Sequence, residues 1–180
     1  YNNYFHELKN YNELKVLIIG LGNIGLDLAK KLNNLGTRVD SISRSGKVPE
    51  FIGRNYKFEE SLEYLFQYDF IISLLPDNRS TKQIINLEFF KKMSNTSIFM
   101  NIGRGSTLKE DDLVEALNKN YLSRAILDVS EIEPIQKSSL LFNNSKIFLT
   151  PHIAAFSPSY WGEEMQLFEY NLNCYLNQEN

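Results

Sequence analysis

The feature that most restricts the fold of this chain is a short apolar run that leads directly into a glycine motif. Residues 15–19 read K-V-L-I-I, a run too short for a helix and typical of a strand buried on both faces. Residues 20–25 read G-L-G-N-I-G, and apolar residues at helical spacing continue to Leu35, with Gly36 as the predicted stop. The chain therefore opens with a strand, a glycine turn and a helix, the start of a βαβ unit.

The same alternation continues along the chain. We predict strands at residues 38–42, 70–75, 97–102, 124–129 and 146–149, and helices at 61–68, 81–93 and 110–118, the last with a capping box of Thr107 and Glu110. Alternating helices and doubly apolar strands indicate an α/β fold: a doubly wound parallel sheet of the Rossmann type, with helices on both faces. Such a sheet binds ligands at the carboxyl ends of its strands.

Composition narrows the class of protein. The chain has 180 residues, enough for one domain, and a net charge of -3, so there is no basic field to attract nucleic acid or an anionic membrane surface. The single cysteine, Cys174, excludes an intramolecular disulfide and favours a reducing compartment, so we expect a cytoplasmic protein. We predict no metal site.

The glycine motif predicts a dinucleotide site. Gly20 would make the tight turn after the strand, Gly22 would let the backbone approach a pyrophosphate, and Gly25 would allow the helix to pack closely on the strand. The helix N-terminus would then hold the negative charge of the pyrophosphate.

The end of the second strand bears on which dinucleotide is bound. It reads Ser43-Arg44-Ser45, and hydroxyls with a guanidinium suit a 2′-phosphate, which favours NADP(H) over NAD(H). The alternative is that Asp40, about 20 residues after Gly20, contacts the ribose hydroxyls as in NAD enzymes and that Arg44 is a surface charge. Asp40 falls within the predicted strand rather than at its end, which favours the first interpretation.

Charged side chains follow three of the later strands. Arg104 lies between two glycines, where its guanidinium is free to bind a substrate carboxylate through paired hydrogen bonds. Residues 128–134 read D-V-S-E-I-E-P, and His152 follows the last strand. A histidine paired with a carboxylate from another strand end suits acid/base chemistry, because the carboxylate favours the imidazolium and fixes the ring orientation.

Taken in order, these motifs are more specific than any one of them. The segments G-L-G-N-I-G, L-L-P-D-N-R-S-T, N-I-G-R-G, D-V-S-E-I-E-P and T-P-H-I-A-A resemble the cofactor-binding domain of the D-isomer-specific 2-hydroxyacid dehydrogenases. The S-R-S after the second strand is similar to the glyoxylate and hydroxypyruvate reductase branch, which uses NADPH. The resemblance runs from about residue 15 to residue 155.

The resemblance implies roles for individual residues. The family's catalytic arginine, glutamate and histidine fall on Arg104, Glu133 and His152, with Glu131 the less favoured glutamate, and Arg104 and His152 would bind the substrate. Its nicotinamide-side aspartate falls on Asp128. Its other cofactor contacts fall on Gly20, Gly22, Asn23, Ile24, Gly25, Leu75, Pro76 and Ile102. The implied reaction is hydride transfer between NADPH and a small 2-keto acid such as glyoxylate or hydroxypyruvate, carried out by a homodimer.

The resemblance also implies a layout for the whole chain and leaves two alternatives open. Residues 1–180 would form a dinucleotide-binding domain, with a connecting helix or hinge over 1–14, the Rossmann core over 15–155 and a C-terminal connecting helix over 156–180. The substrate domain of the family is absent from this chain, which begins at Tyr1 rather than at a methionine. The chain could therefore be a cofactor-binding fragment without turnover, or a dinucleotide-sensing interaction module like the corepressors that resemble these dehydrogenases.

Overall fold

A single parallel sheet forms the centre of the molecule. The computed structural model describes residues 9–177, and its seven strands lie in the order β3-β2-β1-β4-β5-β6-β7, each parallel to its neighbours. The strands are β1 Lys15–Ile19, β2 Arg38–Ile42, β3 Asn55–Tyr56, β4 Phe70–Ser73, β5 Ile98–Asn101, β6 Arg124–Leu127 and β7 Ile147–Leu149. The strand order reverses between β1 and β4, as in dinucleotide-binding proteins, which confirms the predicted doubly wound sheet.

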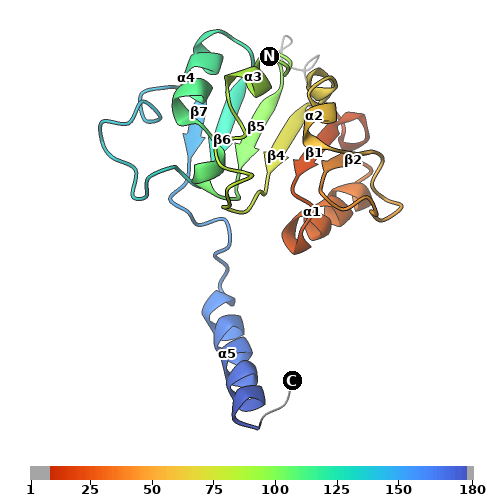
Figure 1. Ribbon diagram of the computed structural model, residues 1–180, viewed down its shortest axis with the longest axis vertical. Coiled ribbons are helices and arrows are strands. Elements are labelled where there is room, and N and C mark those ends of the chain that lie inside the picture. The colour runs from red at the N-terminus through yellow and green to blue at the C-terminus, as the bar shows by residue number, and fades with distance from the viewer. Residues whose placement is uncertain (1–8, 178–180) are drawn as a thin grey trace.

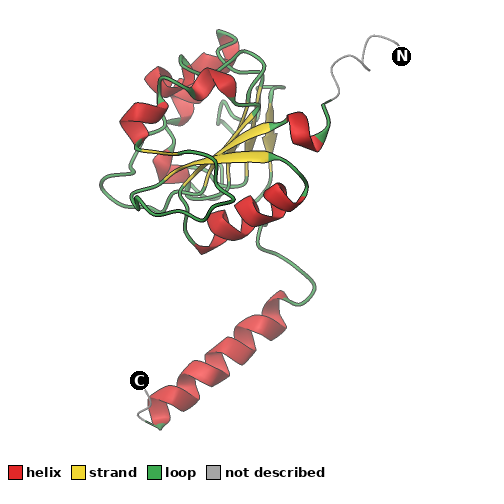
Figure 2. Ribbon diagram, turned by 90° about the vertical axis from the view of Figure 1, so that its right-hand side faces the viewer, coloured by secondary structure: helices red, strands yellow, loops and turns green. Residues whose placement is uncertain are grey.

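Helices cover both faces of the sheet (Figures 1 and 2). The α-helices are α1 Asn23–Asn34, α2 Phe58–Ser61, α3 Leu87–Phe90, α4 Glu110–Asn118 and α5 Tyr160–Leu176, and short 3₁₀ turns lie at Tyr11–Glu13, Leu65–Gln67 and Gly105–Thr107. Alternate residues of β1 enter different cores: Leu17 packs with residues of α3 and α4, and Ile18 packs with Ala29 of α1. Both cores consist of buried apolar side chains, which explains why β1 is apolar from Val16 to Ile19.

The predicted helix over residues 81–93 is wrong in extent, because only α3 is helical there. Gln83 has a φ of 48°, which no helix tolerates, and Ile85 pairs with Leu108 as an isolated parallel bridge. The side chain of Asn86 then accepts hydrogen bonds from the backbone N–H groups of Glu88 and Phe89, so the helix begins only after this cap.

Three smaller predictions also need correction. β3 is a seventh strand that the sequence pattern did not predict, because two residues carry no recognisable alternation. The helix predicted over 61–68 is wrong: α2 ends at Ser61, and only a 3₁₀ turn at Leu65–Gln67 lies within the rest of the range, with Tyr64 outside helical geometry at a φ of -120°. The capping box is wrong: Thr107 donates to the Arg104 carbonyl, and the Glu110 carboxylate accepts from the backbone N–H of Glu131.

The last helix, α5, extends away from the sheet (Figures 1 and 2). Its apolar side chains are exposed, among them Trp161 and Phe168. It falls within the predicted connecting segment 156–180, whereas most of the other predicted connector, residues 1–14, lies outside the described residues. Between residues 9 and 177, none of the helices has both the length and the apolar character needed to cross a membrane.

Candidate active site

The predicted site residues gather at one end of the sheet, where the carboxyl ends of the strands lie, because every strand runs in the same direction. Gly20 follows β1, Leu75 follows β4, Ile102 follows β5, Asp128 follows β6 and His152 follows β7. Parallel strands place their carboxyl ends together, so residues more than a hundred positions apart in the sequence meet at this end of the sheet.

The glycine turn forms a cradle with the geometry that a dinucleotide requires. Gly20 has a φ of 100°, and a Cβ there would lie 2.9 Å from the Leu74 carbonyl oxygen. Gly25 is buried, and a Cβ there would overlap the carbonyl oxygen of Gly20. A Cβ at Gly22 would meet nothing, so this position faces open space. The first N–H groups of α1 have no side-chain cap, which leaves them available to a pyrophosphate. The residues of the glycine turn therefore fit a dinucleotide cofactor.

The walls beside the cradle include the remaining predicted contacts. Asn23 and Ile24 open α1 and are exposed, with Ile24 at 70% although it is apolar. Pro76 is exposed, and Leu75 and Ile102 are half-buried. A Cβ on the neighbouring Gly103 would lie 2.7 Å from the Leu75 carbonyl oxygen, so the loops after β4 and β5 are closely packed.

Asp40, the alternative residue for contacting the ribose hydroxyls, is buried inside the second strand. Asp40 lies in the middle of β2 and is 2% exposed, and its carboxylate accepts hydrogen bonds from the Tyr68 hydroxyl at 2.7 Å and the Arg54 backbone N–H at 2.8 Å. Burial, more than the hydrogen bonds to Tyr56 and Asp40, raises the pKa of Tyr68, so this hydroxyl stays a donor. Asp40 is therefore a buried structural carboxylate. Arg44 is exposed at the end of the strand.

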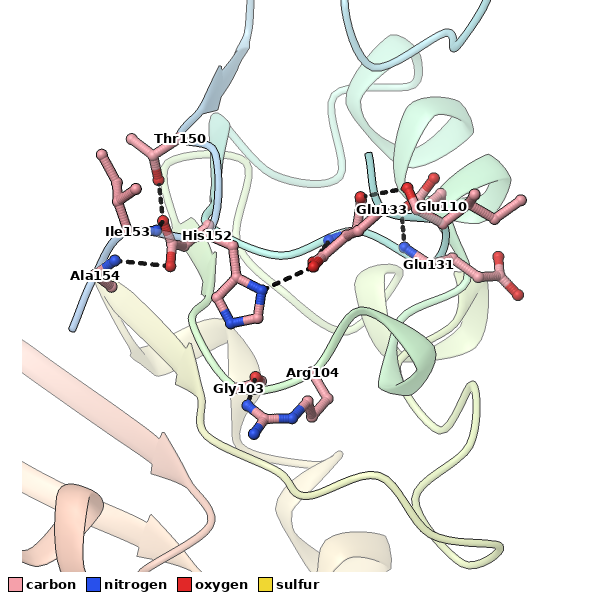
Figure 3. Close-up of polar contacts among 12 residues, drawn as sticks. Gly103, Arg104, Glu110, Glu131, Glu133, Thr150, His152, Ile153 and Ala154 are labelled. Atoms are coloured by element: carbon pink, nitrogen blue, oxygen red, sulfur yellow. Dashed lines mark hydrogen bonds and ion pairs between the residues drawn. The ribbon is translucent and has the colours of Figure 1, made fainter. Parts of the chain in front are cut away.

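His152 and Glu133 form a pair at the ends of β7 and β6 (Figure 3). The Nδ1 atom of His152 lies 2.7 Å from Oε2 of Glu133, and because a carboxylate only accepts, Nδ1 is the donor. The Ser130 backbone N–H donates to the other Glu133 oxygen at 3.0 Å. Burial opposes ionisation of Glu133, but the hydrogen bonds from His152 and Ser130 outweigh it and lower the pKa of this carboxyl.

Glu131 has different partners although it lies two residues away. Its carboxylate accepts from Nε2 of Gln83 at 3.0 Å, and its backbone N–H donates to Glu110 at 2.6 Å. Burial raises the pKa of Glu110, more than its hydrogen bond from Glu131 lowers it. The structure thus brings Glu133, and not Glu131, to the histidine.

Asp128 holds the turn that carries His152. Its buried carboxylate accepts hydrogen bonds from the Thr150 hydroxyl at 2.5 Å and from the backbone N–H groups of Ile153 and Ala154, both at 2.9 Å. Burial opposes its ionisation, but these bonds lower its pKa below the ordinary value. His152 itself has a φ of 56°, so the turn is left-handed at the histidine and depends on these contacts. Sequence reasoning did not identify this supporting role.

Arg104 lies between two glycines that are both buried. A Cβ on Gly105 would overlap the Ser130 carbonyl, which explains the need for glycine there. The Arg104 side chain is exposed, its Nη1 donates to the Gly103 carbonyl at 2.7 Å, and it forms no ion pair with any residue from 9 to 177. In the view of Figure 3, the Arg104 guanidinium is drawn below the imidazole ring of His152, and Glu133 is drawn to the right of that ring.

A cavity adjoins the histidine–glutamate pair. Its volume is about 650 Å³, and apolar residues of the segment after β6 form much of its lining. The lining residues are Asp128, Ser130, Glu133, Pro134, Ile135, Phe142, Leu149, Thr150, Pro151 and His152. The pair therefore borders a concave, largely apolar surface as well as the open end of the sheet.

Known proteins share both this sequence pattern and this fold. The family model of the D-isomer specific 2-hydroxyacid dehydrogenase NAD binding domain matches residues 2–154. A probable 2-ketogluconate reductase of Dictyostelium discoideum is 39% identical over 142 residues, which are 77% of this chain and 42% of that protein. A glyoxylate/hydroxypyruvate reductase A of Salmonella typhi is 36% identical over 147 residues, 79% of this chain and 46% of that protein.

Solved structures give the same result. The NADPH-dependent glyoxylate/hydroxypyruvate reductase of Sinorhizobium meliloti, in complex with NADP and sulfate, has a TM-score of 0.86 and 29% identity and matches 100% of this chain and 60% of its own. A D-isomer specific 2-hydroxyacid dehydrogenase family protein of Aeromonas salmonicida has a TM-score of 0.89 and 28% identity, with the same coverage. This chain spans about half the length of the curated relatives that it matches. It belongs to the D-isomer specific 2-hydroxyacid dehydrogenase family and corresponds to the NAD-binding domain of that family.

Proposed function

We propose that this chain provides the cofactor site and the acid/base groups of a reductase that converts a small 2-keto acid to the 2-hydroxy acid with NADPH. The observation that supports this most strongly is the His152–Glu133 pair, at 2.7 Å, at the same end of the sheet as the glycine cradle and the loop that carries Arg104. A proton donor, an anion-binding guanidinium and a dinucleotide cradle are the three components that such a reduction needs.

The cofactor would lie across the reversal of strand order between β1 and β4. Gly20, Gly22 and the first turn of α1 would hold the pyrophosphate, and the nicotinamide supplies a hydride when bound. Two features support NADP(H) over NAD(H): Arg44 is exposed after β2, and Asp40 is occupied inside the strand. The nicotinamide-side role of Asp128 is part of the same proposal.

The substrate would be oriented by charge. The Arg104 guanidinium would bind the carboxylate of the 2-keto acid and polarise its carbonyl group. Glu133 accepts the hydrogen bond from Nδ1 of His152, which directs the proton on Nε2 toward the substrate. His152 would donate that proton to the oxygen of the reduced carbonyl, and in the reverse direction it would act as the base.

The names of the relatives indicate the substrate class. Several are glyoxylate/hydroxypyruvate reductases, and the structure of one of these contains NADP. We therefore propose glyoxylate and hydroxypyruvate as substrates, and a cytoplasmic homodimer that acts on neither nucleic acid nor membranes.

The direct test is cofactor consumption. Two proteins would be tested: the chain alone, and the chain joined to the substrate domain of a relative, called the completed protein below. Each would be mixed with NADPH or NADH and with glyoxylate or hydroxypyruvate. We expect the completed protein to oxidise NADPH faster than NADH with at least one of these acids. Tight NADPH binding without oxidation by the completed protein would contradict the reductase and favour a dinucleotide-sensing module.

A further inference from the structure

One side chain outside the predicted site holds the loop that follows β2. Asn55 opens β3 and lies opposite Ser41 in the sheet register. Its Oδ1 accepts from the Ser41 hydroxyl at 2.9 Å and from the Ser43 hydroxyl at 3.0 Å. Its Nδ2 donates to the Ser45 carbonyl at 2.7 Å. A single amide therefore contacts the residues on both sides of Arg44.

The orientation of this amide is fixed by its partners. The Ser45 carbonyl can only accept, so it requires the NH₂ group, and the oxygen is left to face the two serine hydroxyls. A flipped amide would place its oxygen against the carbonyl oxygen of Ser45. The contact thus specifies an asparagine rather than any polar residue of the same size.

The same loop is held at two further points. The Nζ atom of Lys57 donates to the Arg44 carbonyl at 3.0 Å, and the Ser43 backbone N–H donates to Tyr56 at 3.3 Å. The hydroxyls of Ser43 and Ser45 donate to protein oxygens within this region. The Arg44 guanidinium remains exposed and has no ion-pair partner among residues 9–177, so the hydrogen-bonded loop presents a cation that can bind an anion.

We propose that Asn55 is a positioning residue for cofactor discrimination, holding the Ser43–Ser45 loop in the shape that presents Arg44 to the 2′-phosphate of NADP(H). This inference rests on the proposed preference for NADP(H). A loop ordered before binding costs less entropy when the ligand binds, and that gain applies only to a ligand that contacts the loop. NADH lacks the 2′-phosphate, so its affinity depends far less on Asn55.

Paired titrations of the full chain test this inference. Dissociation constants would be measured for NADPH and NADH, and for 2′,5′-ADP and 5′-AMP as probes of the adenosine end. We expect Asn55→Ala to raise the dissociation constants of NADPH and 2′,5′-ADP on the order of tenfold. Those of NADH and 5′-AMP should rise less than about twofold. Ser41→Ala is the matched control, because Ser41 contacts Asn55 but not the loop, and it should leave the ratio unchanged. A loss of folding alone would weaken all four ligands equally.

Asn55→Asp keeps the size and both serine contacts but cannot donate to Ser45, so it covers the case in which the alanine variant does not fold. The Asn55→Asp variant should also prefer NADPH over NADH less strongly than wild type does. This difference should persist at about 0.5 M salt, where the added negative charge is screened. An NADPH-to-NADH preference that is unchanged in both variants would overturn the role of Asn55 alone. Tighter binding of NADH by the wild-type chain would instead overturn the proposed cofactor preference, and this inference with it.

Discussion

Glu131 and Glu133 show how two identical side chains in one loop acquire different chemistry. Glu133 accepts from His152 and from the Ser130 N–H, which lowers its pKa despite burial. Glu131 instead accepts a hydrogen bond from Nε2 of Gln83. The two side chains leave the backbone in different directions and reach different partners. Glu131 is therefore a suitable control for substitutions of Glu133.

Glu133→Gln should lower kcat for keto-acid reduction by roughly 100-fold, because the amide no longer fixes the imidazole as a proton donor. The dissociation constant of NADPH and the melting temperature should stay close to wild type, since the cofactor cradle is untouched. Steady-state kinetics of the completed protein, with Glu131→Gln as control, would measure this. An equal loss in both variants would mean that neither carboxylate acts through the histidine.

Some residue assignments could be made from the sequence and others could not. Asp40 falls mid-strand in the sequence pattern as in the structure, because strand ends are marked by apolar periodicity. The contacts of Asn55 and Asp128 could not be predicted, since each depends on backbone groups brought close by the fold.

At the scale of elements, the turn from Thr150 to Ala154 depends on a single buried carboxylate. Asp128 accepts from Thr150, Ile153 and Ala154, and the turn includes the left-handed conformation at His152. A carboxylate with three donors is stabilised in its charged form, which the lowered pKa reflects.

Acid should therefore weaken the fold through this turn. The folded-state pKa of Asp128 lies below its ordinary value of 3.8, so its contribution is present above that value and is lost as the pH falls through the folded pKa. Asp128→Asn should cost roughly 2 kcal/mol of unfolding free energy near neutral pH, because an NH₂ group replaces one acceptor, and it should flatten the acid dependence. Urea unfolding at several pH values, with the exposed Asp111→Asn as control, checks both effects. If the unfolding free energy of Asp128→Asn fell with decreasing pH as steeply as that of wild type, the result would contradict this account.

The glycine turn separates folding from binding at two neighbouring positions. A Cβ at Gly25 would overlap the Gly20 carbonyl, whereas one at Gly22 would meet nothing. Gly25→Ala should cost at least about 2 kcal/mol of unfolding free energy. Gly22→Ala should unfold within about 0.5 kcal/mol of wild type but weaken NADPH binding on the order of tenfold, because the methyl group occupies the pyrophosphate's approach. Denaturant unfolding and NADPH titration distinguish the two; full NADPH affinity in Gly22→Ala would move the cofactor away from this turn.

Elements with a clear apolar pattern were predicted, including the short strand β7, whereas the two-residue strand β3 was not. β1 and α1 follow the predicted positions closely, because each has an apolar pattern and a glycine boundary. β2 also lies where it was predicted, although R-V-D-S-I includes two uncharged or acidic polar residues between its apolar ones. The segment 81–93 has apolar residues at helical spacing, yet the Asn86 cap and the Ile85–Leu108 bridge replace its first turns. β3 pairs through two residues only, which leaves no pattern in the sequence.

At the scale of the molecule, the parallel sheet joins distant residues into one site. The cradle at Gly20 and the histidine at position 152 belong to opposite ends of the domain sequence, and the sheet brings their loops to the same end of the strands. This convergence was predictable because it follows from strand direction alone. The cavity beside Glu133 was not predictable, since its walls come from the irregular segment after β6.

The central claim is that His152 donates the proton in an NADPH-dependent reduction at this end of the sheet. The most direct measurement is the rate of NADPH oxidation by His152→Ala and wild-type completed protein, at saturating NADPH and with glyoxylate or hydroxypyruvate as acceptor. We predict a rate lower by at least about 100-fold in the variant, with the NADPH dissociation constant unchanged. A variant that oxidises NADPH at the wild-type rate would contradict the account.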